Sequence, residues 1–327
     1  MLDVLKVTFP FFALVLCGYL AARWRLLPLE AIGGLNSFVL YFALPAMLYE
    51  FGAGTPLHQM LDPAAFTVYL SCALLMVAGT VRASLNERIR WNDAAFGALV
   101  AAFPNTGFMG VPLLVALLGA AAAGPAILTI VIDLVITSSL CIALSRLDGA
   151  DGHGAGNAAR KALRGMALNP MPWSIALGAL SSGLGVLPIQ PVMATISLLA
   201  AAASPVALFT IGAVLARSQI LAAASEHRPL PARDFVPVAL AKLLVHPLLV
   251  FAAGHAAIAL GLPLDRFALS VMVLVAALPS ASNVSLLAER FDADNGRIAR
   301  IILLTTALAF LTFSAAVAMV GARVTSA

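Results

Sequence analysis

The stretch that most constrains this chain is residues 99–114, an apolar run with helix-breaking residues in its middle. Pro104 removes a backbone hydrogen-bond donor and Gly107 follows it closely, so a helix that begins in this run is expected to stop inside it. Within a bilayer, backbone groups can lack helical partners only where protein, water or a ligand satisfies them. The interruption therefore predicts a cavity at membrane depth.

A second copy of this signal lies far downstream. Residues 274–279, Leu-Val-Ala-Ala-Leu-Pro, repeat residues 99–104, Leu-Val-Ala-Ala-Phe-Pro, with five of six identities. Polar side chains follow both prolines: Asn105 and Thr106 after Pro104, and Ser280, Ser282 and Asn283 after Pro279. Two interrupted spans in matching halves of a chain indicate the substrate site of a transporter.

The composition excludes a water-soluble globule. Of 327 residues, 62% are hydrophobic and 10% charged, with a mean hydropathy of +1.01, which predicts an all-α membrane protein with about ten spans of about 20 residues. Cys17, Cys72 and Cys141 lie in apolar runs without metal-ligand spacing, so we expect no disulfide and no metal site. The net charge of +4 follows from an excess of cytoplasmic Lys and Arg, and no basic motif indicates nucleic acid.

The predicted spans form two inverted five-helix repeats, with broken, crossing helices at positions 4 and 9. Pro45 in the second span of the first half matches Pro205 in the second span of the other, as Pro104 matches Pro279. Residues 148–165, rich in Gly, His, Ala and basic residues, are predicted to be a linker between a repeat at 1–147 and a repeat at 166–327. Because each half has an odd number of spans, the second half enters the bilayer from the opposite side. The predicted spans are approximately 4–22, 32–51, 63–81, 94–118, 126–144, 169–186, 191–216, 236–260, 266–289 and 297–320.

The distribution of basic residues predicts the orientation. Loops after odd-numbered spans hold 15 of the 19 Lys and Arg residues. By the positive-inside rule, this places the linker in the cytoplasm and both termini outside an inner (plasma) membrane.

Each half-helix that begins after a break presents free N–H groups and the positive end of a helix dipole, which attract a carboxylate. Asn105 and Asn283 could add amide donors. A structural alternative is that the prolines only kink these helices and that Asn105 caps the freed turn.

The run Pro104-Asn105-Thr106-x-x-Met109-Gly110-Val111-Pro112-Leu113-Leu114 resembles the crossover helix of the auxin efflux carrier family, which includes the plant PIN carriers. The run from Ala277 through Pro279 and Asn283 to Phe291 is similar to the second crossover helix of its bacterial branch. The resemblance implies elevator-like alternating access for small organic anions, a homodimer, and contact between the substrate carboxylate and Asn105 with its surroundings at Pro104 and Pro279. The linker lacks the large loop of plant carriers, so malonate, malate and related mono- or dicarboxylates are nearer substrates than auxin-like acids.

Three ionisable residues lie inside predicted spans and are candidates for coupling to a proton or another cation: Asp133, Lys242 and His246. Lys242 and His246 share a helix face. Structural alternatives remain for each: Lys242 could snorkel to the interface, His246 could bind a carbonyl freed by Pro247, and Asp133 could hydrogen-bond to a Ser or Thr.

The favoured hypothesis is thus a secondary transporter of small organic acids in the lipid bilayer, without a cofactor. Alternatives are a sodium-coupled symporter of the bile acid type and a membrane receptor that binds a carboxylate without transporting it. An enzyme is not expected, because the chain has no Ser/His/Asp set with shared-face spacing, no His-Glu-x-x-His and no phosphate-binding loop.

Overall fold

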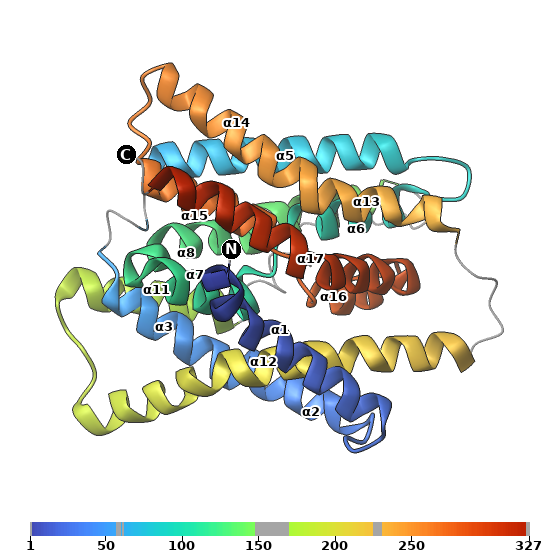
Figure 1. Cartoon of the computed structure of the whole chain (residues 1–327), viewed down its shortest axis with the longest axis horizontal. Helices are drawn as coiled ribbons and strands as arrows, with labels where there is room; N and C mark the ends of the chain where they lie inside the picture. The colour runs from blue at the N-terminus through green and yellow to red at the C-terminus, as the bar shows by residue number, and fades with distance from the viewer. Residues whose placement is uncertain (1, 57–59, 61, 148–169, 225–230, 325–327) are drawn as a thin grey trace. The chain divides into compact units, whose positions relative to one another are not determined.

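A computed structural model describes residues 2–56, 60, 62–147, 170–224 and 231–324. Helices account for all regular secondary structure in these segments, apart from one isolated bridge between Pro104 and Ser280 (Figure 1). The predicted all-α class is confirmed. The predicted linker, residues 148–165, lies outside the described residues.

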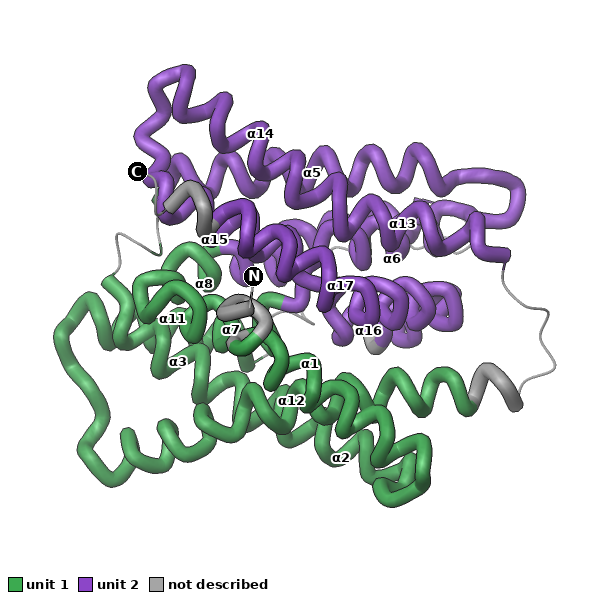
Figure 2. Tube along the Cα trace, in the orientation of Figure 1, with its two compact units in different colours: residues 1–62, 106–128, 169–227 green, residues 63–105, 129–168, 228–327 purple. Residues whose placement is uncertain are grey.

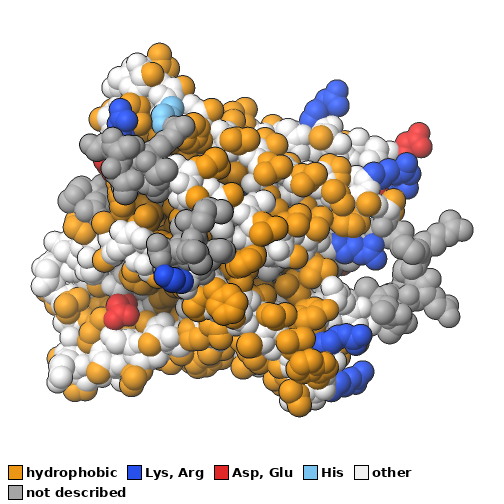
Figure 3. Space-filling model, viewed as in Figure 1, with side chains coloured by type: hydrophobic (Ala, Val, Ile, Leu, Met, Phe, Trp, Pro, Cys, Tyr) orange, Lys and Arg blue, Asp and Glu red, His pale blue; other side chains and the backbone are white. Residues whose placement is uncertain are grey.

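The helices are those of a multi-pass membrane protein. Figure 3 shows hydrophobic side chains over much of the visible surface, with most of the visible Lys and Arg side chains along its right-hand edge. Within the described residues, six helices are long and apolar enough to cross a membrane: Ala31–Gly54, Pro63–Ser84, Ala120–Leu144, Gln190–Ile220, Val236–Ala259 and Asn295–Val320. Shorter apolar helices cover Thr8–Arg23, Thr106–Leu118 and Arg266–Ala277.

The chain divides into two compact units, and each unit is assembled from separate stretches of sequence (Figure 2). Unit 1 comprises residues 1–62, 106–128 and 169–227, and unit 2 comprises residues 63–105, 129–168 and 228–327. Each unit therefore takes segments from both of the predicted repeats. The division into repeats at 1–147 and 166–327 concerns internal similarity and stays a prediction.

Unit 1 is built around close helix crossings. Its main helices are α1 (Leu2–Arg23), α2 (Ala31–Phe38), α3 (Leu44–Gly54), α7 (Val111–Leu118), α11 (Pro170–Leu184) and α12 (Gln190–Ala224), with α8 (Ala123–Val131) divided between the units. A Cβ atom on Gly18 would lie 1.8 Å from the carbonyl oxygen of Phe209, and one on Gly212 would lie 1.8 Å from that of Val15. Because neither glycine has a side chain, α1 and α12 pack backbone against backbone.

Unit 2 has the most deeply buried helices. It contains α5 (Pro63–Ser84), α6 (Trp91–Ala102), α9 (Ser138–Leu144), α13 (Val236–Leu240), α14 (His246–Ala259), α15 (Arg266–Ala277), α16 (Val284–Arg290) and α17 (Asn295–Val324). Every residue of α6 from Ala94 to Ala102 and every residue of α15 from Val271 to Ala277 is buried. Helices that are apolar all round belong in a core, and these two lead directly into the interruptions predicted from the sequence.

Candidate functional site

Both predicted interruptions are breaks in helices. Helix α6 ends at Ala102 and α15 ends at Ala277. Phe103 and Leu278, the residues before the two prolines, have extended backbone with ψ angles of 100° and 156°. Proline disfavours helical geometry in the residue that precedes it, so the sequence stops each helix at the position where the apolar run alone would continue it.

The two breaks meet inside unit 2. The amide of Asn105 donates to the carbonyl oxygen of Pro279 at 2.8 Å, and the amide of Ala281 donates to that of Phe103 at 2.9 Å. These bonds form the isolated antiparallel bridge between the two extended segments. We call residues 103–105 and 278–283 the crossing. It brings together segments that are about 175 positions apart in the sequence.

A third amide of the crossing also donates to protein. Ser280 N–H donates to the hydroxyl of Thr305 at 3.2 Å, and this hydroxyl donates in turn to the carbonyl oxygen of Ile302 at 3.0 Å. Thr305 is fully buried in α17. Sequence reasoning did not select it, although a threonine pair, Thr305 and Thr306, in the middle of an apolar span was a usable signal.

Side-chain atoms, by contrast, are left without partners at the crossing. Asn105 Oδ1, Ser280 Oγ and Asn283 Oδ1 are buried and have no hydrogen-bond partner within the described residues. Buried polar groups are normally satisfied, so a cluster of unpartnered ones requires an explanation such as a ligand. Hydroxyl and carboxamide groups can donate to a carboxylate without introducing a competing charge.

The other predicted substrate-binding residues occupy three positions. Pro104 and Pro279 are buried in the crossing itself, and Ser282 is half-buried in the turn before α16. Thr106 and Gly107 begin a π-helical turn, η2 (Thr106–Gly110), in unit 1. Thr106 is fully buried, and within the described residues its hydroxyl has no partner.

Asp133 lies in a π-helical turn, η4 (Ile132–Thr137), and is fully buried. Its Oδ2 accepts a hydrogen bond from the Tyr69 hydroxyl at 3.0 Å, and its Oδ1 accepts one from the Thr137 hydroxyl at 3.2 Å. The carbonyl oxygen of Asp133 accepts both the backbone amide of Ser138 and the Ser138 hydroxyl, the latter at 2.8 Å. Such turns within α-helices frequently occur at functional sites.

Lys242 is fully buried in a second π-helical turn, η6 (Ala241–Val245). Its ammonium donates to the carbonyl oxygen of Ala276 at 2.6 Å and lies 3.2 Å from Nδ1 of His246. The alternative that Lys242 snorkels to the interface is therefore wrong. Ala276 lies in the last turn of α15, where free carbonyls and the negative end of the helix dipole favour a cation, so the ammonium is satisfied inside the protein.

These ionisable groups form one buried series in unit 2. The ring of Tyr69, which donates to Asp133, lies 6.1 Å from the ring of His246, and His246 contacts Lys242. Nε2 of His246 is buried without a partner within the described residues. Through Ala276, the series reaches the helix end that leads into the crossing.

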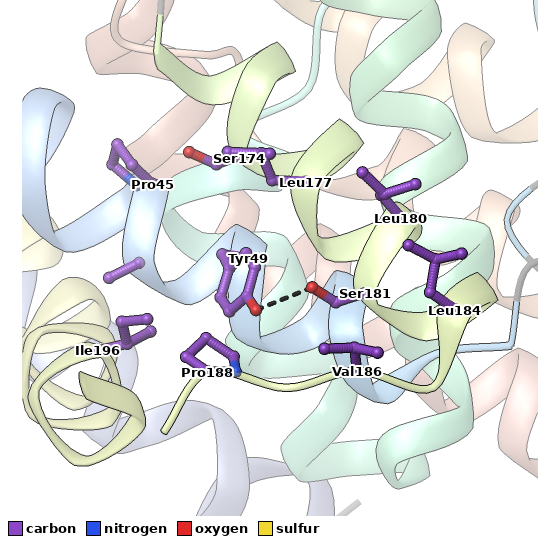
Figure 4. Close-up of a pocket in the computed structure, with 11 residues that line it drawn as sticks. Pro45, Tyr49, Ser174, Leu177, Leu180, Ser181, Leu184, Val186, Pro188 and Ile196 are labelled. Carbon is purple, nitrogen blue, oxygen red and sulfur yellow. Dashed lines mark hydrogen bonds between the residues drawn. The ribbon is translucent and has the colours of Figure 1, made fainter. Parts of the chain in front are cut away.

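Unit 1 holds a cavity that, unlike the polar crossing, is lined mostly by apolar side chains. It has a volume of about 470 Å³ and lies between α3, α11 and the start of α12 (Figure 4). The hydroxyls of Tyr49 and Ser181 in its lining hydrogen-bond to each other at 2.9 Å. None of the predicted site residues lines it, so it is separate from the crossing.

Comparison with known proteins identifies the family of the chain. The sequence matches the family described as "Membrane transport protein" over residues 3–153 and 155–317. It is 30% identical to a Rhizobium meliloti protein named "Putative malonate transporter", covering 95% of this chain and 94% of that protein. It is 26% identical to the Escherichia coli "Uncharacterized transporter YfdV", covering 86% and 87% of the two chains. It is also 26% identical to Arabidopsis thaliana "Auxin efflux carrier component 4", over 45% of this chain and 24% of that protein. The chain thus belongs to the membrane transport protein family that includes the auxin efflux carriers.

Proposed function

We propose that the chain is a secondary transporter of small organic anions and that the crossing binds the substrate carboxylate. The observation that carries this proposal is the buried, unpartnered Ser280 hydroxyl, which can donate to a carboxylate. The carboxamides of Asn105 and Asn283 lie in the same crossing, where their Oδ1 atoms also lack partners within the described residues and their Nδ2 groups are donors. Pro104 and Pro279 end both helices at one place, where the backbones of the two segments hydrogen-bond. Thr106 and Gly107, the next residues along the chain, and Ser282 complete the proposed set.

The substrate class follows from the chemistry of the crossing. Hydroxyls and carboxamide Nδ2 groups bind a carboxylate through hydrogen bonds, and the N-terminus of α16, which begins at Val284 directly after the crossing, adds partial positive charge. The proposed substrate is a small mono- or dicarboxylate such as malonate or malate, and the name of the Rhizobium meliloti relative supports malonate as the first probe. Auxin-like acids are a further class to screen.

The proposed architecture is ten spans in two inverted repeats, with the linker at residues 148–165 in the cytoplasm and both termini outside. The matched pairs Pro45/Pro205 and Pro104/Pro279 support the repeat, and the asymmetry of Lys and Arg supports the orientation. The division into two compact units, one of which holds the crossing, supports elevator-like alternating access. The protein is proposed to be a homodimer in the cell inner membrane.

We place coupling at the buried series of Asp133, His246 and Lys242. A fully buried carboxyl group held by two hydroxyls can gain or lose a proton without a rearrangement of its neighbours, because a hydroxyl both donates and accepts. The contact from Lys242 to Ala276 links this series to the helix that enters the crossing. Proton uptake at Asp133 could thus alter the field at the anion site.

Binding and flux test the central proposal. In a thermal-shift screen of the purified protein against short carboxylic acids, a substrate is expected to raise the melting temperature, since it binds only the folded state. In proteoliposomes, Asn105→Ala is expected to abolish malonate flux while the protein still folds. Asn36→Ala, in helix α2, is the matched control and is expected to retain flux. Unchanged flux in Asn105→Ala would contradict a carboxylate site at the crossing.

A second experiment identifies the coupling ion. Asp133→Asn is expected to abolish the stimulation of flux by a pH gradient while leaving the exchange of labelled for unlabelled malonate in place. The competing function, a sodium-coupled symporter of the bile acid type, is favoured by the four side-chain oxygen atoms of Tyr69, Thr137 and Asp133 that could coordinate a cation. Replacing sodium with choline separates the two, because only the symporter would lose flux. Binding without any flux would instead identify a receptor.

A further inference from the structure

Arg297, near the start of α17, is the largest of the fully buried side chains, with 2% of its surface exposed. Its guanidinium contacts three other elements of unit 2. Nε donates to the carbonyl oxygen of Asp234 at 2.7 Å, Nη1 donates to that of Asp93 at 2.8 Å, and Nη2 lies 3.4 Å from the Ser84 hydroxyl. The backbone amide of Arg297 donates to the carboxylate of Asp294 at 2.9 Å. One side chain thus joins the end of α5, the start of α6 and the short helix η5 (Ala232–Asp234) to α17.

The start of α6 is also tied to the segment that follows α16. Asn92 Nδ2 donates to the carbonyl oxygens of Phe291 and Asp292 at 3.1 and 3.0 Å. The amide of Asp294 donates to the carboxylate of Asp93 at 2.7 Å. Together with the guanidinium, these bonds fix the first turn of α6 against residues 291–297. We call this set of contacts the Arg297 clamp.

The opposite end of α6 leads into the crossing, where Asn105 bonds to Pro279 and Phe103 bonds to Ala281. Helix α6 has 12 residues, so the two ends are about 18 Å apart at 1.5 Å per residue. Both ends are therefore bonded to the same downstream stretch, residues 279–297. The result is a closed frame in which α6 forms one side and α16 lies on the other.

The clamp fits against α6 at a residue without a side chain. A Cβ atom on Gly97 would lie 2.7 Å from Nη1 and 3.0 Å from Nη2 of Arg297. The guanidinium therefore occupies the place that any other residue at position 97 would fill. A planar group with several fixed donors can reach two carbonyls and a hydroxyl in different directions, which a lysine ammonium at the same position could not reproduce.

We propose that Arg297 is a positioning residue for the anion site. It fixes the far end of α6 and so keeps Pro104 paired with Ser280 and Asn105 hydrogen-bonded to Pro279, without itself touching the substrate. This inference rests on the proposed function of the crossing. Its structural part, that the Arg297 clamp stabilises the hydrogen bonds of the crossing, can be measured without any substrate.

The experiment measures hydrogen exchange at the crossing in the full-length protein. In Arg297→Lys and in Gly97→Ala, the amides of Asn105 and Ala281 are expected to exchange about tenfold faster or more, because hydrogen bonds from a charged donor that hold the frame are lost. The matched controls are Arg290→Lys, an exposed arginine in the last turn of α16, and Gly79→Ala, where a Cβ meets nothing within 4 Å. Both controls are expected to exchange like the native protein.

Malonate flux in proteoliposomes supplies the second readout. A positioning role predicts that the two clamp variants raise KM more than they lower the maximal rate, whereas a general loss of folded protein would lower the maximal rate alone. Folded Arg297→Lys with native exchange at Asn105 and Ala281 would overturn the inference and leave the proposed function intact. If Arg297→Lys does not accumulate, Gly97→Ala decides by the same criterion. If the native protein does not carry malonate, faster exchange in the variants would still establish the clamp while the proposed function failed.

Discussion

Replacing Thr305 with valine would remove one hydroxyl that holds the crossing, with almost no change in side-chain shape. The Ser280 amide donates to this hydroxyl at 3.2 Å, and the hydroxyl donates to the Ile302 carbonyl. In Thr305→Val, the Ile302 carbonyl keeps another donor, because the Thr306 hydroxyl also bonds to it at 2.7 Å. The cost therefore falls on the Ser280 amide, a buried donor left without a partner, and such a group costs about 1–3 kcal/mol. We expect the free energy of unfolding to fall by this amount.

The assay compares Thr305→Val with Thr312→Val on the same helix. The Thr312 hydroxyl bonds only to the Leu308 carbonyl within its own helix, at 3.3 Å among the contacts that the structure describes, so its loss is expected to change stability by no more than about 0.5 kcal/mol. Both variants are purified in the same detergent, and their thermal unfolding is followed together with hydrogen exchange at Ser280. Equal melting temperatures and equal exchange in the two variants would refute the assignment of Thr305 as a support of the crossing.

Two further substitutions test other contacts. Gly212→Ala places a Cβ 1.8 Å from a carbonyl oxygen of α1. Since a backbone atom cannot move aside, we expect thermal unfolding to show a destabilisation of about 1–3 kcal/mol or more. The control is Gly79→Ala, whose Cβ meets nothing within 4 Å and should leave stability unchanged or slightly higher; equal stability of the two variants would contradict the close packing of α1 on α12. Tyr69→Phe removes a donor to Asp133, and the buried carboxylate should lose about 1.5–3 kcal/mol of hydrogen bonding. Tyr41→Phe, at a 60% exposed tyrosine, is its control, and matching unfolding curves would show that the hydroxyl contributes nothing.

The positions of the two breaks could be predicted from the sequence because the repeated hexapeptide identifies Pro104 and Pro279 as a pair. A proline alone would not have been enough, because α1 continues through Pro10 and α12 continues through Pro205. The sequence also predicts an all-α membrane protein, since composition alone decides that question. The first prediction rests on a short sequence motif and the second on the composition of the whole chain, and neither depends on which distant segments come into contact.

Contacts between distant segments could not be predicted in the same way. Arg297 was one of several basic residues whose distribution indicated orientation, yet it is buried against the backbone of other elements. Lys242 near a span end resembled a snorkelling residue, because the acceptor that satisfies it belongs to Ala276, 34 positions away. The π-helical turn that holds Asp133 alters the register of its helix, and an apolar run carries no periodic signal that would indicate such a turn.

The discontinuous make-up of the units has a consequence for biosynthesis. Unit 1 needs residues 1–62 and 169–227 together, so α1 cannot pack against α12 until more than half of the chain has been made. Until then, the surface of α1 at Gly18 lacks the Phe209 backbone that packs against it in the folded protein. The first spans are therefore expected to stay in the membrane without their final packing until α12 is inserted, and a chain that ended before α12 would lack the partner of α1 rather than form a working half.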